Sequence, residues 1–281
     1  MDKLYDIFST LVSPFISVWL YMRMLRGKED RARLPERLGY ASTARPKGEL
    51  LWLHAASVGE AVSILPLIER IMALYPHLRL LLTTGTRTSA TVMETGLPPA
   101  VIHQYVPVDT KTATWNFMRH WRPDIALFVE SEFWPNLVKA ARRWHCFMGV
   151  INARMSERSF AFWRKYPRMI ASMFTCFDIV FAQSSDDKIR FERLGAKQVF
   201  AVGNLKYEAA PLPCNESKLL TFKAAIGTRP VWLAASTHPG EETEIAAVHK
   251  AITSRHPNLL TLIVPRHPER GATIAAELQK Q

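Results

Sequence analysis

Short apolar runs alternate with helical patterns along most of this chain, and this alternation is the feature that most limits its fold. The run at residues 50–54 (LLWLH) has the length and composition of a strand buried on both faces. Further strands are expected at residues 78–83, 101–106, 125–129, 147–151, 179–182, 199–202, 230–234 and 259–264. Helices are expected at residues 60–75, 89–93, 112–121, 136–144, 186–194, 241–255 and 274–280. This order predicts a doubly wound α/β fold with a mainly parallel sheet, which binds ligands at the carboxyl ends of its strands.

The pattern divides the chain into four parts. Residues 1–30 form an apolar helix with a basic flank, and residues 31–205 carry a first α/β domain. Residues 206–228 contain two prolines and no strand character, which predicts a linker. Residues 229–281 begin a second βα pattern. Two strands and two helices are fewer than an independent doubly wound domain of roughly 100 residues contains, so we expect only the start of a second domain.

The N-terminal helix is expected to lie at a membrane surface. Residues 4–22 are mostly apolar or aromatic, and the basic stretch 23–28 follows them, whereas a cleavable signal peptide carries its charges before the apolar run. A membrane span needs about 20 apolar residues, and Asp6 and Pro14 interrupt this run. An interfacial or marginally spanning helix with its basic flank on the cytoplasmic side is therefore predicted. The alternative is a helix docked on the body of the protein.

Charge and cysteine usage restrict the partners. Lys and Arg number 36 against 25 Asp and Glu, a net charge of +11 that points to an anionic partner without choosing among nucleic acid, acidic membrane and phosphorylated substrate. It also fits a basic surface kept for solubility. No interleaved aromatic and basic motif of the RNA-binding kind occurs, so nucleic acid is not expected. Cys146, Cys176 and Cys214 are far apart with no CxxC spacing, which argues against a zinc site and fits a reducing compartment.

The first chemical candidate is the turn at residues 57–60 (SVGE), between a predicted strand and a helix. Glu60 in the first helical turn could act as a base, and Gly59 allows close approach to the backbone. The same spacing is a helix capping box, with Ser57 as N-cap and Glu60 three residues on. A helix N-terminus favours the ionised carboxylate, so we expect capping to lower the basicity of Glu60. On the local pattern alone, capping is the favoured interpretation.

Three further motifs follow predicted strands of the first domain. Residues 130–136 (ESEFWPN) place two carboxylates and two aromatic side chains where they could face a cleft, or where the acids could simply be solvated. Asn152 and Arg154 could hold substrate oxygens or phosphate, although a loop-stabilising role for Asn152 is equally compatible with the pattern. Lys206 could neutralise a phosphate at the end of the domain, or be an ordinary surface lysine.

The second domain repeats the strand, small turn and helix plan at residues 235–241 (ASTHPGE). A helix N-terminus of this kind can bind phosphate. Residues 264–270 (VPRHPER) follow the next strand, where Arg266 and His267 could clamp a nucleotide phosphate. The alternative for His267 is a hydrogen-bonded loop histidine.

Taken in order, the motifs SVGE, ESEFWPN, NARMSERS, GNLKY, STHPGEE and PRHPER strongly resemble those of the bacterial 3-deoxy-D-manno-octulosonic acid (Kdo) transferases, over nearly the whole chain. The resemblance implies a GT-B fold, in which two Rossmann-like domains face each other across a cleft. It implies inverting transfer of Kdo from CMP-Kdo to the lipid A precursor lipid IVA, in lipopolysaccharide core biosynthesis at the cytoplasmic side of the inner membrane. It implies no obligate metal and no cofactor besides the donor CMP-Kdo.

The resemblance also implies roles for five residues. Glu60 matches the general base that deprotonates the acceptor hydroxyl. Glu132 and Lys206 match residues assigned to transition-state stabilisation, and Arg266 and His267 match part of the CMP site. The anionic inner-membrane surface, lipid IVA and CMP-Kdo are the partners that these assignments imply.

One departure from the family pattern concerns the donor site. The family continues with a glycine-rich stretch and a His-Asn-Pro-Leu-Glu motif that completes the nucleotide pocket, and neither occurs in these 281 residues. We therefore expect a truncated second domain and little or no turnover by this chain alone. The alternative hypothesis is a non-catalytic remnant that binds the lipid A precursor without the donor.

Overall fold

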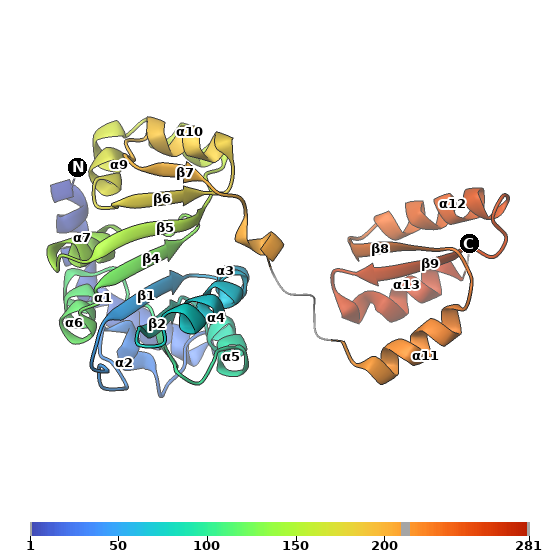
Figure 1. The fold of residues 1–281 in the computed structure, drawn as a ribbon, viewed down its shortest axis with the longest axis horizontal. Coiled ribbons are helices and arrows are strands. Elements are labelled where there is room, and N and C mark those ends of the chain that lie inside the picture. The colour runs from blue at the N-terminus through green and yellow to red at the C-terminus, as the bar shows by residue number, and fades with distance from the viewer. Residues whose placement is uncertain (1, 209–213, 280–281) are drawn as a thin grey trace. The chain divides into compact units, whose positions relative to one another are not determined.

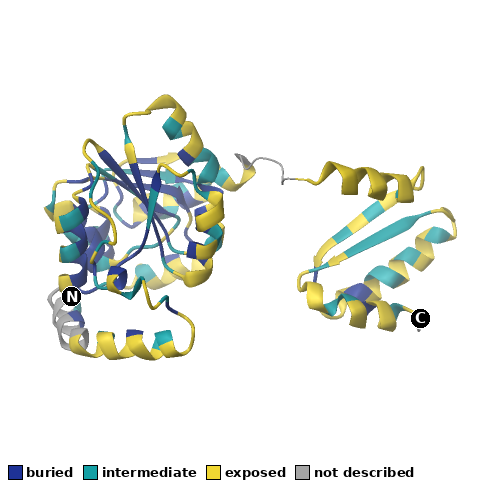
Figure 2. Ribbon diagram, turned by 90° about the horizontal axis from the view of Figure 1, so that it is seen from below, coloured by how far each residue is buried: buried dark blue, intermediate teal, exposed yellow. Residues whose placement is uncertain are grey.

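The structure is a computed structural model that describes residues 2–208 and 214–279. The chain forms two compact units, Met1–Ala210 and Pro211–Gln281, and each is considered by itself. The first unit carries the larger sheet and most of the buried core (Figures 1 and 2).

The first unit is built on a seven-stranded parallel sheet with the order β3-β2-β1-β4-β5-β6-β7. This confirms the predicted mainly parallel α/β fold. The chain moves outward from β1 in one direction and then crosses to β4 on the other side, so the strand order reverses between β1 and β4. Ligands of such sheets bind at the carboxyl ends of the strands beside this reversal. The strands are β1 (Leu50–Ala55), β2 (Arg79–Thr84), β3 (Val101–Tyr105), β4 (Ile125–Val129), β5 (Phe147–Ala153), β6 (Ile179–Ala182) and β7 (Val199–Ala201).

Helices cover both faces of this sheet, because each strand is apolar on both sides. One core cluster joins Trp52 and Phe128 of the sheet to Phe117, Leu137 and other side chains of α6, α7, α9 and α10. A second joins the opposite strand face to side chains of α3, α4 and α5. The helices are α1 (Asp2–Leu25), α2 (Leu34–Arg37), α3 (Val58–Ser63), α4 (Leu65–Leu74), α5 (Arg87–Gly96), α6 (Lys111–Trp121), α7 (Pro135–Arg143), α8 (Glu157–Trp163), α9 (Pro167–Phe174), α10 (Ser185–Arg193) and the 3₁₀ helix η1 (Leu205–Glu208).

The structure differs from the predicted helices in several places, and α2 and α11 (Glu216–Ile226) are among the helices that were not predicted. The single helix expected at residues 60–75 is two helices, α3 and α4, that meet at Ile64. Pro66 lies in the first turn of α4, where its missing N–H is tolerated, but it cannot continue the hydrogen bonding of α3. Helices α8 and α9 had no predicted counterpart, although Ile170, Met173 and Phe174 of α9 are buried at helical spacing.

The second unit contains a parallel pair of strands, β8 (Val231–Thr237) and β9 (Leu260–Pro265), as the sequence predicted. Its helices are α11 (Glu216–Ile226), α12 (Glu241–Thr253), η2 (Pro268–Arg270) and α13 (Gly271–Leu278). Helix α11 lies within the stretch 206–228 interpreted as a linker, and none of its residues is buried. In the described part of this unit, the buried residues are Thr237, Glu242 and Ile274. Figure 2 shows that most of its other residues are intermediate or exposed.

Helix α1 docks on the first unit. The Tyr5 hydroxyl donates to Asp109 at 2.6 Å, Leu20 is buried, and Arg23 forms an ion pair with Glu29 at 2.7 Å. Within residues 2–208 and 214–279, no helix combines the length and the hydropathy that crossing a membrane requires. The contacts of α1 match the alternative that the sequence left open, a helix docked on the body of the protein. Association of α1 with a membrane stays a prediction.

Candidate active site

The candidate residues of the first unit gather at the carboxyl edge of its sheet. Glu60 follows β1, Glu130 and Glu132 follow β4, Asn152 is the last residue but one of β5, and Lys206 lies on η1 after β7. Strands β1 and β4 are neighbours, so the sheet order brings together carboxylates that are 70 residues or more apart in the chain. The site lies at the reversal of strand order, where the fold predicts ligand binding.

Glu60 occupies the capping position that its spacing predicted. The Ser57 hydroxyl oxygen accepts the Glu60 N–H at 3.2 Å and donates to Glu60 Oε1 at 2.8 Å. The Ala56 N–H donates to Glu60 Oε2 at 2.9 Å. The side chain is therefore held in one orientation, with the residue 7% exposed. Capping and catalysis are compatible uses of this residue, because the cap fixes the carboxylate without neutralising it.

The capping hydrogen bonds lower the pKa of Glu60, as expected, but they do not set its net direction. Burial raises the pKa of Glu60, and this effect exceeds the opposing hydrogen bonds from Ser57 and Ala56. The negative charge of Glu130 raises the pKa further, whereas the positive charge of Lys206 lowers it. A short helix end gives a modest electrostatic stabilisation, which desolvation of a carboxylate can outweigh. A raised pKa makes Glu60 a stronger base once ionised.

Lys206 forms its ion pair with Glu130. Its Nζ lies 2.7 Å from Glu130 Oε1. Glu130 adopts a left-handed backbone conformation with φ 58°, and its N–H donates to the Ile151 carbonyl at 3.0 Å. This conformation costs free energy for a non-glycine residue, and residues that adopt it cluster at functional sites. The resemblance assigned a role to Glu132 and none to Glu130, and no local pattern indicates the contact of Glu130 with Lys206, which is 76 residues away.

Glu132 lies in the same electrostatic environment without a cationic partner among the interactions described. Its Oε2 accepts a hydrogen bond from Trp134 Nε1 at 3.1 Å. Burial raises the pKa of Glu132, and the negative charges of Glu60 and Glu130 raise it further. Three carboxylates therefore share one site with a single described lysine, an arrangement that disfavours full ionisation of all three.

Asn152 positions the loop that carries Lys206. Its Oδ1 accepts the Leu205 N–H at 3.0 Å, which is the loop-stabilising role left open by the sequence. The residue is 1% exposed, has φ 51°, and its Nδ2 has no hydrogen-bond partner in the structure. The Arg154 carbonyl accepts a hydrogen bond from Ser131, which joins the loops after β4 and β5. The predicted ligand role of these two residues stays untested, but both stabilise the edge of the site.

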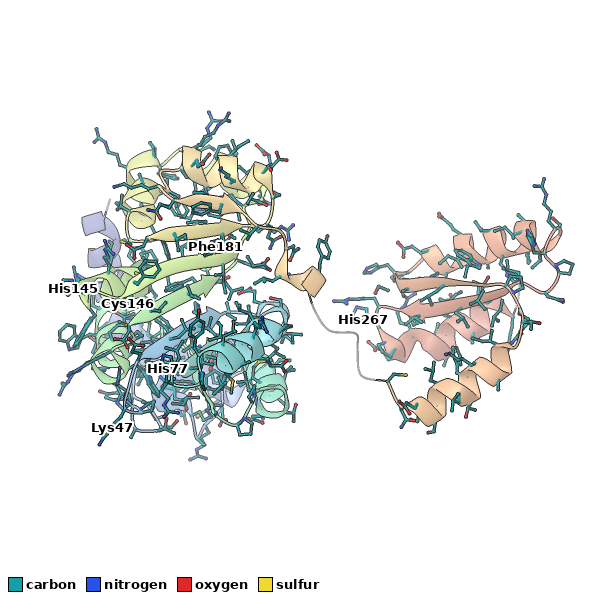
Figure 3. The ribbon with its side chains drawn as sticks, in the orientation of Figure 1. Lys47, His77, His145, Cys146, Phe181 and His267 are labelled. Atoms are coloured by element: carbon teal, nitrogen blue, oxygen red, sulfur yellow. The ribbon has the colours of Figure 1, made fainter. Side chains whose placement is uncertain are left out.

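Arg266 and His267 lie on the second unit, directly after β9; His267 is labelled in Figure 3. The Arg266 N–H donates to the Thr237 carbonyl at 3.0 Å, which fixes its backbone and leaves its side chain available. His267 Nδ1 lies 3.6 Å from Glu269 Oε1, and both side chains are largely exposed. No group of three or more His, Cys, Asp or Glu side chains suited to a metal ion occurs within the described residues.

Solved structures share this fold at low sequence identity. A UDP-GlcNAc 2-epimerase from Neisseria meningitidis, bound to UDP-GlcNAc, aligns with a TM-score of 0.56 and 15% identity over 83% of this chain and 70% of its own. Another UDP-N-acetylglucosamine 2-epimerase aligns with a TM-score of 0.55 and 15% identity over 84% of this chain and 67% of its own. The chain therefore has an α/β fold like that of these GT-B-like neighbours.

The chain belongs to the 3-deoxy-D-manno-octulosonic acid transferase (Kdo transferase) family, whose sequence model matches residues 32–209. It is 35% identical to the 3-deoxy-D-manno-octulosonic acid transferase of Rickettsia bellii over 98% of this chain. It is 32% identical to that of Haemophilus influenzae over 96% of this chain. The chain spans 65% and 64% of the lengths of these two relatives.

Proposed function

We propose that this chain is part of an inverting glycosyltransferase that transfers Kdo from CMP-Kdo to lipid IVA. The observation that carries the proposal is the buried Glu60 carboxylate with its raised pKa, at the strand reversal of a Kdo transferase family member. A fixed carboxylate of raised basicity at this position suits a general base, because proton transfer is most effective when the pKa of the base approaches the working pH.

In the proposed reaction, Glu60 removes the proton from the acceptor hydroxyl. The hydroxyl oxygen forms a bond to the anomeric carbon of Kdo from the face opposite the leaving group, and the bond from that carbon to the CMP phosphate oxygen breaks. The electron pair departs with CMP, and the proton stays on Glu60. Inversion follows from this single displacement.

The proposed roles of the remaining residues follow from charge. Lys206, held by Glu130 at 2.7 Å, supplies the positive charge that offsets negative charge developing in the transition state. Glu132, whose own pKa is raised by burial and by the negative charge of Glu60, is proposed to contribute to stabilising the transition state. Arg266 and His267 are proposed to bind the CMP phosphate, since both are cationic or can become so and follow a strand end of the second unit.

A location at the cytoplasmic surface of the inner membrane is part of the proposal. Phe15, Val18, Met22 and Leu25 are 46–70% exposed and repeat at helical spacing, forming a stripe on α1 that we call the outer stripe. The basic residues Arg26 and Lys28 follow it. An apolar stripe flanked by basic residues favours binding to an anionic lipid surface without a span.

The test is transfer of radiolabelled Kdo from CMP-Kdo to tetra-acylated lipid A precursor. We expect product from the longest protein that the gene encodes and its near-complete loss in E60Q. Absence of product with the unaltered protein would refute the proposal. For residues 1–281 alone we expect little turnover, and robust turnover would show that the segments described here suffice for donor binding.

A second candidate function is acceptor binding without catalysis. The candidate base, the other carboxylates and the lysine all lie on the first unit. The second unit, which is proposed to bind the donor, has two described strands. This distribution favours acceptor binding over donor binding by the chain. Binding of lipid IVA to residues 1–281 with no detectable binding of CMP-Kdo would favour this candidate.

A further inference from the structure

A mainly apolar cavity of about 400 Å³ lies between helix α1 and the loops at the carboxyl edge of the sheet. One wall is formed by Ile16, Trp19 and Leu20 of α1. The opposite wall is formed by residues 106–110, which follow β3, and by Trp134. Its volume is within the range of about 300–1,000 Å³ that is typical of small-molecule pockets.

Polar contacts hold α1 at both ends of this cavity. Toward the N-terminus of the helix, Tyr5 donates to Asp109, which also accepts the backbone N–H groups of Asn136 and Leu137. Toward the C-terminus, Glu29 pairs with Arg23 at 2.7 Å and with Arg37 at 3.0 Å. These contacts hold α1 opposite the loops that form the other wall of the cavity.

The cavity shares its wall with the candidate catalytic carboxylates. Ala56 lines the cavity, and its N–H donates to Glu60 Oε2 at 2.9 Å. Trp134 also lines it, and its indole N–H donates to Glu132 Oε2 at 3.1 Å. An apolar group inside the cavity would therefore carry any attached polar group to the neighbourhood of Glu60 and Glu132.

Helix α1 presents two different surfaces. The lining residues Ile16, Trp19, Leu20 and Arg23 repeat at helical spacing, as do Phe15, Val18, Met22 and Leu25 of the outer stripe, which line no part of the cavity. One side of the helix is thus available to a lipid surface while the other encloses the cavity. Helical periodicity separates the two uses.

We propose that the cavity binds one acyl chain of the acceptor lipid and so directs the reacting hydroxyl toward Glu60. The inference rests on the proposed function, because it takes the acceptor to be an acylated sugar. The apolar lining selects a hydrocarbon chain. The shared walls at Ala56 and Trp134 select the chain of the reacting lipid rather than that of a bystander membrane lipid.

The test uses N-acylglucosamine 1-phosphates with acyl chains of 4–12 carbons. Titration calorimetry measures their binding to residues 1–281 at ligand concentrations below the critical micelle concentrations. We expect affinity to rise by up to about fourfold per methylene, the factor that corresponds to about 0.8 kcal/mol. I16W fills the cavity and should weaken binding of the 12-carbon compound at least tenfold. F15W, the adjacent position on the outer stripe, is the matched control and should bind like the unaltered chain.

A second cavity-filling variant, folding controls and a different lipid complete the experiment. V108W fills the cavity from the opposite wall and should reproduce I16W, while circular dichroism and thermal melting establish that each variant is folded. Affinity independent of chain length, or an equal loss in F15W, would overturn the inference. So would equally tight binding of a lysophosphatidylglycerol with the same chain, because the cavity would then belong to a membrane lipid.

Failure of the proposed function gives a different result. Chain-length-dependent binding that I16W abolishes, combined with no Kdo transfer by the longest protein, would count against the transferase proposal and leave the acyl cavity supported. If I16W transfers Kdo with the same KM as the unaltered protein for both long-chain and short-chain acceptors, the result would count against the acyl-chain cavity alone.

Discussion

Lys206 Nζ lies 2.7 Å from Glu130 Oε1, although the two residues are 76 positions apart in the chain. The pair joins the end of β4 to the η1 turn after β7, beside the buried Glu60. It gives the site a positive charge in a fixed place and assigns to Glu130 a positioning role that the sequence alone did not distinguish from that of Glu132.

Replacing Lys206 should slow catalysis more than it affects folding. We expect K206A to lower kcat for Kdo transfer by about 10²–10³-fold, the loss typical when one preorganised charge-stabilising group is removed. Its thermal midpoint should change little, because a half-exposed ion pair contributes little to stability. K188A removes the surface pair Lys188–Glu192 of α10 and serves as the control. Equal kcat values for K206A and K188A would exclude a catalytic role for Lys206.

The pH dependence of the reaction should report the neighbours of Glu60. The base must be ionised, so the acidic limb of the kcat/KM profile follows its pKa. The Ser57 hydrogen bond and Lys206 lower the pKa of Glu60, so S57A and K206A should move this limb to higher pH. Glu130 raises that pKa, so E130Q should move the limb to lower pH. Shifts of the same sign in all three variants would contradict this assignment.

The capping role of Ser57 can be separated from its effect on the base. S57A should lower the free energy of unfolding by about 0.5–2 kcal/mol, the usual cost of removing an N-cap side chain. Chemical denaturation of the whole chain measures this. S57D restores a capping acceptor and should recover most of the stability, whereas a loss equal to that of S57A would show that the hydroxyl is not capping α3.

The second unit should unfold in acid through Glu242. Hydrogen bonding to Arg270 is the main cause that lowers the pKa of Glu242 to about 2. The folded pKa is below the ordinary value of 4.5, so this stabilisation is complete above pH 4.5 and is lost as the pH falls toward 2. Trp232 is the only tryptophan after residue 163, so its fluorescence reports this unit.

A matched variant tests the same ion pair. E242Q should weaken the second unit at neutral pH and flatten its stability between pH 4.5 and 2, with W232F used to isolate the signal. E269Q, which alters an exposed carboxylate nearby, should leave both properties unchanged. An unaltered acid transition in E242Q would show that another group governs it.

Binding of anionic vesicles should depend on the outer stripe of α1 and on its basic flank. V18D and L25D should each weaken co-sedimentation with phosphatidylglycerol vesicles strongly, since both side chains are exposed and apolar. K28A should weaken it about fivefold, which corresponds to about 1 kcal/mol per basic residue near the surface, and added salt should reduce this difference. L74D, at an exposed leucine of α4, is the control. Equal losses in L74D and L25D would argue against a specific membrane face.

The sequence by itself determined the features that depend on neighbours along the chain. Strand and helix alternation predicted the parallel sheet, because apolar periodicity reflects which side chains must be buried. The spacing of Ser57 and Glu60 predicted the cap, because capping is a contact within one turn. The order of the motifs indicated the Kdo transferase family, to which the chain belongs.

Only the tertiary structure decided the features that depend on distant residues. The strand order placed Lys206 beside Glu130, and burial outweighed the capping hydrogen bonds in setting the direction of the pKa shift of Glu60. The contacts of Tyr5 and Arg23 docked α1 over a cavity that no local pattern encodes. The physical reason is that desolvation and ion pairing are set by every element packed around a group, whereas periodicity and capping are set within a few residues.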